Sequence, residues 1–439
     1  MKKKIGQWKR LLAAILALLF LCPVLTGCGE DTQSTLSIDK VKINQKGELI
    51  ITYTDGTKEN LGVVVGKDGQ DGQDGANGSD GVNSSITLEG DALAAATTQG
   101  LRSSVSIFCT FSGSASWLGS YSSSAGSGVI YQLDKENGDA FIITNYHVVY
   151  NPNSKTNNGI SDDIQVLLYG SELSNMAIPA QYVGGSMYYD IAVLHIDNSD
   201  LLRQSDAAAV TVADSDTIAP GTTAIAIGNA EGEGITVTSG IVSIASEQLP
   251  MIAADNVTSV TFRVMRIDTP VNPGNSGGGL FNAFGQLIGI VNAKIIDDDV
   301  ENIAYAIPTS VSVSVAQNII DYCFGTETVR VQRPMLGITI AITESRAIYD
   351  KTTGKLHIAE TVEITEVSKG SLGDGVLQVG DILVSAELNG TKKELTQQHH
   401  LIDLLVTARV GDTVNLTILR NGSPVTVSIG ITQDCLTEH

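Results

Sequence analysis

The sequence predicts a mainly β protein with more than one domain, and three observations support this. The chain has 439 residues, which is enough for two or three domains with their own cores. It contains 45 glycines but only 10 prolines, which indicates many turns. Between about residues 102 and 308, short apolar runs alternate with Gly, Ser, Asn and Asp turns, and helical periodicity is scarce. This pattern is typical of a β-barrel or a β-sandwich.

The N-terminus predicts an export signal. A basic region up to Arg10 precedes an apolar run, Leu11 to Leu21, that is too short to span a bilayer as a stop-transfer helix. The following Leu25-Thr26-Gly27-Cys28 is similar to a bacterial lipobox. We therefore expect cleavage before Cys28, lipidation of its thiol, and attachment to the outer face of the cell membrane. An ordinary secretory signal with a chance cysteine is the alternative, and the order of basic, apolar and small segments disfavours it.

Two segments separate the signal from the main domains. Residues 28–65 predict a tether and a small β-hairpin module, because β-branched runs alternate there with turns such as Asp55-Gly56. From Gly66 to Gly81, glycine occupies every third position, which is the period of collagen. No proline occurs in that run, so its composition favours a flexible acidic linker and disfavours a collagen-like helix. We expect this linker to span residues 66–90.

Charge and cysteine content exclude several classes of function. The formal net charge of −21 disfavours nucleic acid as a partner, since a phosphate-binding surface needs clustered Lys and Arg. Beyond Cys28, the thiols of Cys109, Cys323 and Cys435 are odd in number and widely spaced. They fit neither a disulfide framework nor a metal site. We expect single thiols, no metal and no cofactor.

One seryl loop carries the strongest chemical signal. Ser276 lies in Asn272-Pro273-Gly274-Asn275-Ser276-Gly277-Gly278, where glycines on both sides allow a tight bend that points the N–H groups of Gly274 and Ser276 at one oxygen. A plain Gly-Ser loop, as at Gly126-Ser127-Gly128, is the alternative. Hydrolysis by serine also needs a histidine as base and a carboxylate to orient it. His147 follows an apolar strand, and Asp190 opens another. The order His, Asp, Ser is that of the chymotrypsin-type double barrel.

At this point the chain resembles the HtrA/Deg family of trypsin-like serine proteases over about two hundred residues. The resemblance implies a double β-barrel, the catalytic triad His147, Asp190 and Ser276, and an oxyanion hole at Gly274 and Ser276. It also implies unfolded or misfolded proteins as substrates, and homotrimers. The segments that carry it are Gly126–Ile130, Thr144–Val149, Tyr189–Leu194, Ala226–Asn229, Thr238–Ser243, Pro273–Gly278 and Ala304–Pro308.

The resemblance also places a small apolar substrate pocket at Val271 and at Val291, Asn292 and Lys294. Periplasmic members of the family carry an apolar residue at the position of Lys294. The lysine departs from them and resembles Gram-positive members instead. Pro270 stands six residues before Ser276, where a tryptic enzyme would carry an aspartate, so cleavage after Lys or Arg is not expected. We expect His195 to be a surface residue and Asp268 to be structural.

The C-terminal region resembles a PDZ domain. Leu336, Gly337 and Ile338 fit its carboxylate-binding turn, which implies recognition of peptide C-termini by strand addition. An amphipathic helix is expected near Leu395 to Thr407, with His399 and His400 solvated beside it. The expected division is 1–27 for the signal, 28–65 for the tether and β module, 66–90 for the linker, 91–325 for the protease and 334–433 for the PDZ domain.

The sequence leaves two alternatives to an exported, membrane-anchored endopeptidase that degrades misfolded or damaged proteins. Gly274-Asn275-Ser276-Gly277-Gly278 formally fits the elbow of an α/β-hydrolase, but that fold needs alternating helices and a histidine after the serine. A quality-control chaperone or peptide-binding scaffold with little proteolysis is the second alternative. An intact triad argues against it without excluding an additional holding role.

Overall fold

The computed structural model describes residues 38–44, 46, 48–63, 92–112, 121–171, 176–293, 303–352 and 354–439. The predicted signal, Cys28, the glycine-repeat run and Lys294 lie outside these residues. The chain divides into two compact units, Met1–Ser85 and Ile86–His439. Most of the described chain is β, so the predicted fold class is confirmed.

The first unit contains a three-stranded antiparallel sheet in the order β1-β2-β3. Its strands are Ile38–Ile43, Glu48–Tyr53 and Lys58–Val63. Gly56 closes the second turn with φ 86°, and its N–H donates to the Tyr53 carbonyl at 2.9 Å. Glycine suits this position because a side chain is disfavoured at positive φ.

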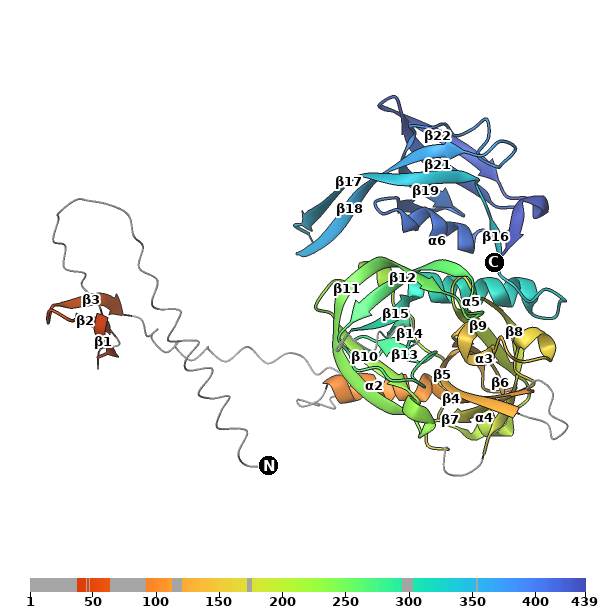
Figure 1. Ribbon diagram of the computed structural model, residues 1–439, viewed down its shortest axis with the longest axis horizontal. Helices are drawn as coiled ribbons and strands as arrows, with labels where there is room; N and C mark the ends of the chain where they lie inside the picture. The colour runs from red at the N-terminus through yellow and green to blue at the C-terminus, as the bar shows by residue number, and fades with distance from the viewer. Residues whose placement is uncertain are drawn as a thin grey trace, which may run out of the picture. The chain divides into compact units, whose positions relative to one another are not determined.

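The second unit begins with α2 and then closes a six-stranded barrel in the order β4-β5-β6-β9-β8-β7 (Figure 1). The strands are β4 Ser104–Ser112, β5 Tyr121–Asp134, β6 Asp139–Thr144, β7 Asp163–Leu168, β8 Ile178–Ser186 and β9 Ile191–Ile196. β9 is buried along its whole length. Leu194 faces the barrel core, whereas Val193 packs in the cluster that contains α5.

A second closed barrel follows, in the order β10-β11-β12-β15-β14-β13. Its strands are β10 Thr223–Gly228, β11 Thr236–Ile252, β12 Ser259–Ile267, β13 Gly279–Phe281, β14 Leu287–Asn292 and β15 Ala304–Pro308. An apolar core that includes Met265, Leu280 and Val291 fills it. The two barrels are the double-barrel architecture that the family resemblance implied.

Helices are few and short in the barrel region, as expected, but the sequence did not predict α2. The described α-helices of the barrel region are α2 Ala92–Ser103, α3 Tyr146–Val149, α4 Asp200–Gln204 and α5 Thr309–Cys323, and the 3-10 turns are η1 Asn157–Gly159, η2 Ser215–Thr217 and η3 Ala230–Gly232. Sequence reasoning missed α2, because its buried face consists of Ala96, Gly100 and Ser103 and carries no large apolar side chain. A Cβ at Gly100 would lie 2.5 Å from the Ile227 side chain, so this face must be small.

The expectation that His195 lies at the surface is wrong. Its residue exposure is 9%, and its ring contacts those of Phe141 and Phe324 with centroid distances of 4.9 and 4.8 Å. His195 shares a strand face with Ile191 and Val193, and helix α5 packs against β8 and β9. That covering helix removes from solvent a face that strand alternation alone would leave exposed.

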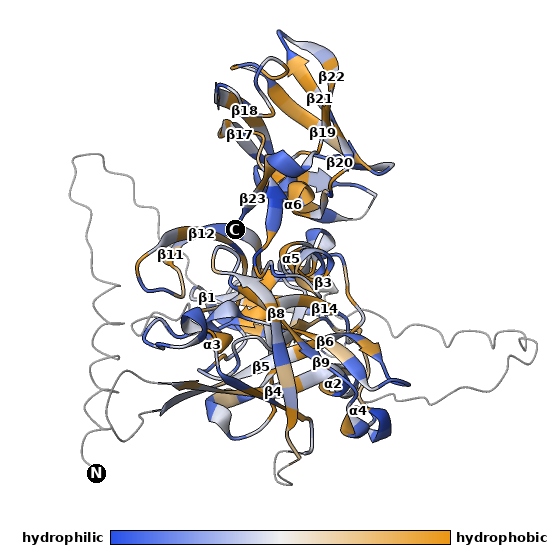
Figure 2. Ribbon diagram, turned by 90° about the vertical axis from the view of Figure 1, so that its right-hand side faces the viewer, coloured by the Kyte–Doolittle hydropathy of each residue, from blue (hydrophilic) through white to orange (hydrophobic). Residues whose placement is uncertain are grey.

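The C-terminal part is a six-stranded sheet in which five strands follow the order β17-β18-β19-β21-β22, and the sixth, β20, pairs with β19. Its elements are β17 Ile338–Asp350, β18 Lys355–Val367, β19 Ile382–Leu388, β20 Thr391–Glu394, α6 His399–Thr407, β21 Thr413–Arg420, β22 Ser423–Gly430 and η4 Gln433–Cys435. Hydrophobic residues run along β19, β21 and β22 (Figure 2). A separate pair, β16 Gln332–Pro334 with β23 Leu436–Glu438, flanks the sheet in sequence.

Candidate active site

Three polar side chains from separate segments meet at one point of the double barrel. His147 lies in α3 directly after β6, Asp190 lies in the turn before β9, and Ser276 lies in the loop between β12 and β13. His147 Nδ1 is 2.6 Å from Asp190 Oδ2, and His147 Nε2 is 2.8 Å from Ser276 Oγ. The first barrel therefore supplies the base and the carboxylate, and the second barrel supplies the hydroxyl. This is the geometry by which an imidazole can take a proton from a nucleophilic serine.

Main-chain and side-chain donors fix Asp190 in place. The residue is buried and has φ 49°, a left-handed conformation that costs a non-glycine residue about 1–3 kcal/mol. Its Oδ1 accepts the His147 N–H at 3.0 Å, and its carbonyl accepts the Asn145 side-chain amide at 2.8 Å. Asn292 Nδ2 donates to Asp190 Oδ2 at 2.8 Å. The carboxylate is thus aimed at Nδ1 of the imidazole by contacts that leave it little freedom to rotate.

The nucleophile loop needs its glycines for steric reasons. Gly274 and Gly277 have φ 97° and 83°. A Cβ at Gly277 would lie 2.2 Å from the Ser127 carbonyl oxygen, and one at Gly274 would lie 2.2 Å from the Asn229 carbonyl oxygen. Only a residue without a side chain permits this close approach.

The predicted oxyanion donors are available. Within the described part of the chain, the N–H groups of Gly274 and Ser276 donate to no protein acceptor. Ser276 Oγ also accepts the Ala293 N–H, at 3.2 Å. Two N–H groups beside a nucleophilic hydroxyl suit the stabilisation of a tetrahedral oxyanion.

The predicted pocket residues lie in three different places. Val271 and Val291 are buried in the core of the second barrel. Asn292 donates to Asp190 Oδ2, a contact that sequence reasoning missed. Lys294 lies outside the described residues. No local pattern signals the contact of Asn292, because its partner is 102 residues away in the chain.

The predicted peptide-binding turn lies at the start of β17, an edge strand of the C-terminal sheet. Gly337 has φ 67°, and its carbonyl accepts the Ser368 N–H at 2.8 Å. Leu336 is buried, and its carbonyl accepts the Gly373 N–H at 2.9 Å. Ile338 then begins the ladder with β18. Among the described strands β17 pairs only with β18, and its other side is the edge that strand addition requires.

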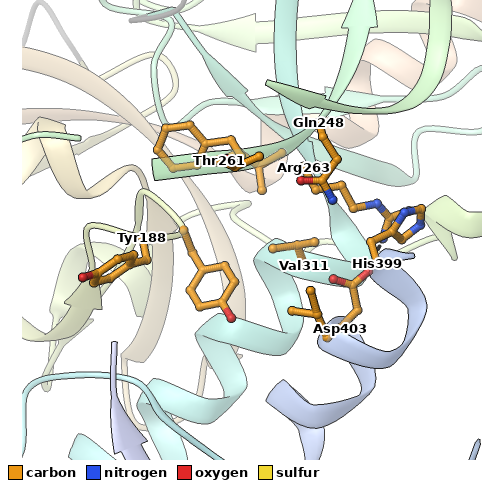
Figure 3. A pocket seen from close by; sticks show the side chains of 11 residues that line it. Tyr188, Gln248, Thr261, Arg263, Val311, His399 and Asp403 are labelled. Atoms are coloured by element: carbon orange, nitrogen blue, oxygen red, sulfur yellow. Dashed lines mark hydrogen bonds and ion pairs between the residues drawn. The ribbon is translucent and has the colours of Figure 1, made fainter. Parts of the chain in front are cut away.

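A buried charge cluster that contains no triad residue lies beside a small pocket lined by β11, β12, α5, α6 and the Tyr188–Tyr189 segment (Figure 3). Arg263 contacts both Asp216 and Asp403. Burial raises the pKa of Asp403 to about 6 against the opposing effect of Arg263. Burial also lowers the pKa of His399 to about 2, reinforced by Arg263. The expectation of a solvated His399 is therefore wrong, since the residue is buried beside a cation.

The thiols and acidic groups offer no rival chemistry in the described residues. Cys109, Cys323 and Cys435 are free, and burial raises the pKa of Cys109 and of Cys323 to about 12. No described group of three or more His, Cys, Asp or Glu side chains is placed to hold a metal ion. Asp268 accepts the Ile241 N–H at 2.6 Å, which is a structural contact.

Comparison with known proteins agrees with this geometry. Residues 126–290 match the family model of the trypsin-like peptidase domain. The serine protease Do-like HtrA of Lactococcus lactis subsp. lactis is 32% identical over 346 residues, which cover 75% of this chain and 76% of that protein. The chain belongs to the HtrA family of serine proteases.

Two further relatives give the extent of the likeness. The serine protease Do-like HtrA of Bacillus subtilis is 34% identical over 320 residues, which are 71% of this chain and 64% of that protein. The solved structure of the HtrA-type protease AlgW with a tripeptide has a TM-score of 0.50 at 27% identity, and it covers 79% of this chain and 97% of that one. Membership of the HtrA family makes the chain a serine endopeptidase.

We predict that Asp190→Asn lowers kcat by about four orders of magnitude, because an amide can hold the imidazole in the wrong tautomer. The rate of casein digestion by the purified protein measures this. Asp162→Asn is the matched control, since Asp162 is an exposed carboxylate that accepts hydrogen bonds only from Ser112 and Thr156 among the described residues. A near-normal rate for Asp190→Asn together with a low rate for the control would assign the orienting carboxylate to Asp162.

Proposed function

We propose that this HtrA-family chain is an exported, membrane-anchored endopeptidase that degrades misfolded or damaged proteins with the triad Ser276, His147 and Asp190. The observation that carries the proposal is the continuous hydrogen-bond chain from the Asp190 carboxylate through the imidazole to the Ser276 hydroxyl.

The geometry supports a two-step acyl transfer. Ser276 Oγ attacks the carbonyl carbon of the scissile peptide while His147 Nε2 takes the hydroxyl proton. The carbonyl oxygen becomes an oxyanion that accepts hydrogen bonds from the N–H groups of Gly274 and Ser276. His147 then gives its proton to the leaving amine, and the C–N bond breaks. A water activated by the same nitrogen hydrolyses the acyl-enzyme, while Asp190 stabilises the imidazolium in both steps.

A chaperone or scaffold with little proteolysis is the second candidate function. Its support is the separate C-terminal sheet with an unpaired edge strand at β17, which suits the holding of extended peptides. The aligned triad favours the protease, since a scaffold has no need for an imidazole positioned within 2.8 Å of a buried serine hydroxyl.

The experiment that separates these functions is digestion of casein by the wild type and by Ser276→Ala. We expect the variant to remain folded and to lose at least about three orders of magnitude of activity, because triad members act as a unit. Mass spectrometry of the cut sites then reports the preference for the residue before the cut. Appreciable cutting by a clean Ser276→Ala preparation would remove Ser276 from the role of nucleophile.

The membrane part of the proposal depends on Cys28 and on the basic and apolar segments before it. Among the described residues, no helix has the length and hydropathy needed to cross a bilayer. A lipid chain on Cys28 would supply an anchor that does not depend on a transmembrane helix. The protein would then lie on the extracytoplasmic face of the cell membrane.

We expect Cys28→Ser to lose metabolic lipid labelling and to leave the membrane fraction, since the modified thiol is absent. Fractionation of cells that express the full chain measures both properties, with Cys109→Ser as the control for loss of an unrelated thiol. A Cys28→Ser chain that stays uncleaved and membrane-bound would show that the apolar segment itself is the anchor.

The C-terminal sheet is proposed to be a PDZ domain that binds free peptide C-termini. The turn Leu336-Gly337-Ile338 precedes the edge strand β17, so a ligand added to that edge would bring its terminal carboxylate to the N–H groups of the turn. A Cβ at Gly337 would lie 2.2 Å from Ser371 Cβ, so the turn tolerates no side chain there. Bound C-termini would both deliver substrate and shift the protease toward its active state. The family resemblance further suggests a homotrimer.

We predict that the full chain with Ser276→Ala binds a peptide with a free apolar C-terminus more tightly than the same peptide amidated at its terminus. The reason is that only the free peptide offers a carboxylate to the turn. Isothermal titration measures both affinities, and Gly337→Val is the variant expected to weaken binding of the free peptide. Equal affinities for the free and amidated peptides would show that no carboxylate is recognised.

A further inference from the structure

One buried hydroxyl joins the two barrels at the oxyanion donors. Ser127 belongs to β5 of the first barrel and has an exposure of 0%. The nucleophile loop that carries Gly274 and Ser276 belongs to the second barrel. Sequence reasoning treated Ser127 only as a member of a Gly-Ser segment and gave it no chemical role.

The hydrogen bonds of Ser127 have a fixed direction. The Asn229 N–H donates to Ser127 Oγ at 2.7 Å, so the hydroxyl acts as the acceptor in that bond. Its single proton is then directed to the Gly274 carbonyl, which lies 2.7 Å away. The Ser127 N–H donates to the Ser276 carbonyl at 2.8 Å. Both residues that offer an oxyanion N–H therefore have their carbonyl held by Ser127.

These bonds determine the orientation of the peptide planes around Gly274. On one side, the Pro273 carbonyl accepts the Glu231 N–H at 2.8 Å, which turns the Gly274 N–H away from η3. On the other side, Ser127 Oγ holds the Gly274 carbonyl. The Asn275 N–H, which lies in the same peptide plane as the Gly274 carbonyl, donates to the Asn272 carbonyl at 3.0 Å. Glycine can adopt several backbone conformations, so these bonds to the two flanking planes together favour φ 97° at Gly274.

Ser127 also supports the segment that holds Pro273. Asn229, whose N–H binds Ser127 Oγ, directly precedes η3, and Glu231 of η3 has φ 60°. Without the hydroxyl, the Asn229 N–H and the Gly274 carbonyl would both lose a buried partner. An unpaired buried polar group is unfavourable enough that the backbone would be expected to rearrange.

We propose that Ser127 is a positioning residue for the oxyanion hole, which sets the Gly274 and Ser276 N–H groups for the transition state without contacting substrate. This inference rests on the proposed function of Ser276. It separates the role of Ser127 from that of the triad, because Ser127 has no hydrogen bond to the side chains of His147 or Asp190.

The test compares Ser127→Ala with Ser312→Ala in the purified full chain. Ser312 is an equally buried serine of α5 whose hydroxyl donates to the carbonyl of Pro308, the residue before that helix, so it controls for the loss of a buried hydroxyl. Labelling with a fluorophosphonate counts active sites, and a fluorogenic peptide gives kcat and KM per active site. A peptide boronic acid, which forms a tetrahedral adduct on serine, reports stabilisation of the transition state.

For Ser127→Ala we expect kcat per active site to fall by about 10- to 100-fold with KM unchanged, which is less than the loss caused by deleting an oxyanion donor outright. The boronate affinity should weaken by a similar factor, and the pH profile of kcat/KM should keep its midpoints. Ser127→Cys, with a weaker donor of similar shape, should fall between wild type and Ser127→Ala. It also provides the measurement if Ser127→Ala does not fold.

Several outcomes would overturn the inference. A wild-type kcat per active site, even with fewer active sites, would leave Ser127 a purely structural role. A shifted pH midpoint would show that it acts through His147. A wild-type protein that is not labelled at Ser276 would instead refute the proposed function itself, so the two failures are distinguishable.

Discussion

The site depends on one constraint, which is that the two barrels must meet so that a histidine of one lies within hydrogen-bond distance of a serine of the other. The bond of 2.8 Å between His147 Nε2 and Ser276 Oγ crosses this junction. Neither barrel contains a complete site, because Asp190 and His147 come from the first and Ser276 and Asn292 from the second. Apolar packing holds the junction, in a cluster that combines Val129 and Ile143 of the first barrel with Ile227 and Phe281 of the second. Packing between the barrels therefore decides whether the serine has a base at all.

Hydrogen bonds across the same junction fix the orientation of groups that apolar packing only brings close together. Apolar contacts are non-directional, so they bring segments together without fixing the direction of an N–H group. The chain adds directed bonds where direction matters, from Asn292 to the Asp190 carboxylate and from Ser127 to the Gly274 carbonyl. The first of these bonds is buried and the second is part-buried, and each joins residues more than one hundred positions apart. Preorganised groups of this kind do not have to reorient during the reaction, which is the main source of their catalytic value.

The sequence predicts much of this arrangement. The features that it does not predict have physical reasons. The strands, the double barrel and the positions of His147, Asp190 and Ser276 follow from apolar periodicity, turn residues and the family resemblance. The roles of Asn292 and Ser127 do not, because a buried amide or hydroxyl has no periodicity and its partner is chosen by tertiary structure. Strand alternation does not predict the burial of His195, because α5, which covers its strand face, is distant in sequence. Helix α2 escaped because small residues form its buried face.

The buried charges of this protein show that a shifted pKa does not by itself mark the active site. Perturbed pKa values often mark catalytic groups. Here burial raises the pKa of Asp403 to about 6 and lowers that of His399 to about 2, in a cluster organised around Arg263 and not around the nucleophile. Arg263 pairs with two carboxylates, which compensates for the desolvation of its own charge. None of these groups adjoins a nucleophile with free N–H donors, whereas His147 does. A shifted pKa reports burial, a neighbouring charge or a hydrogen bond, and a catalytic role additionally requires a reacting atom within reach.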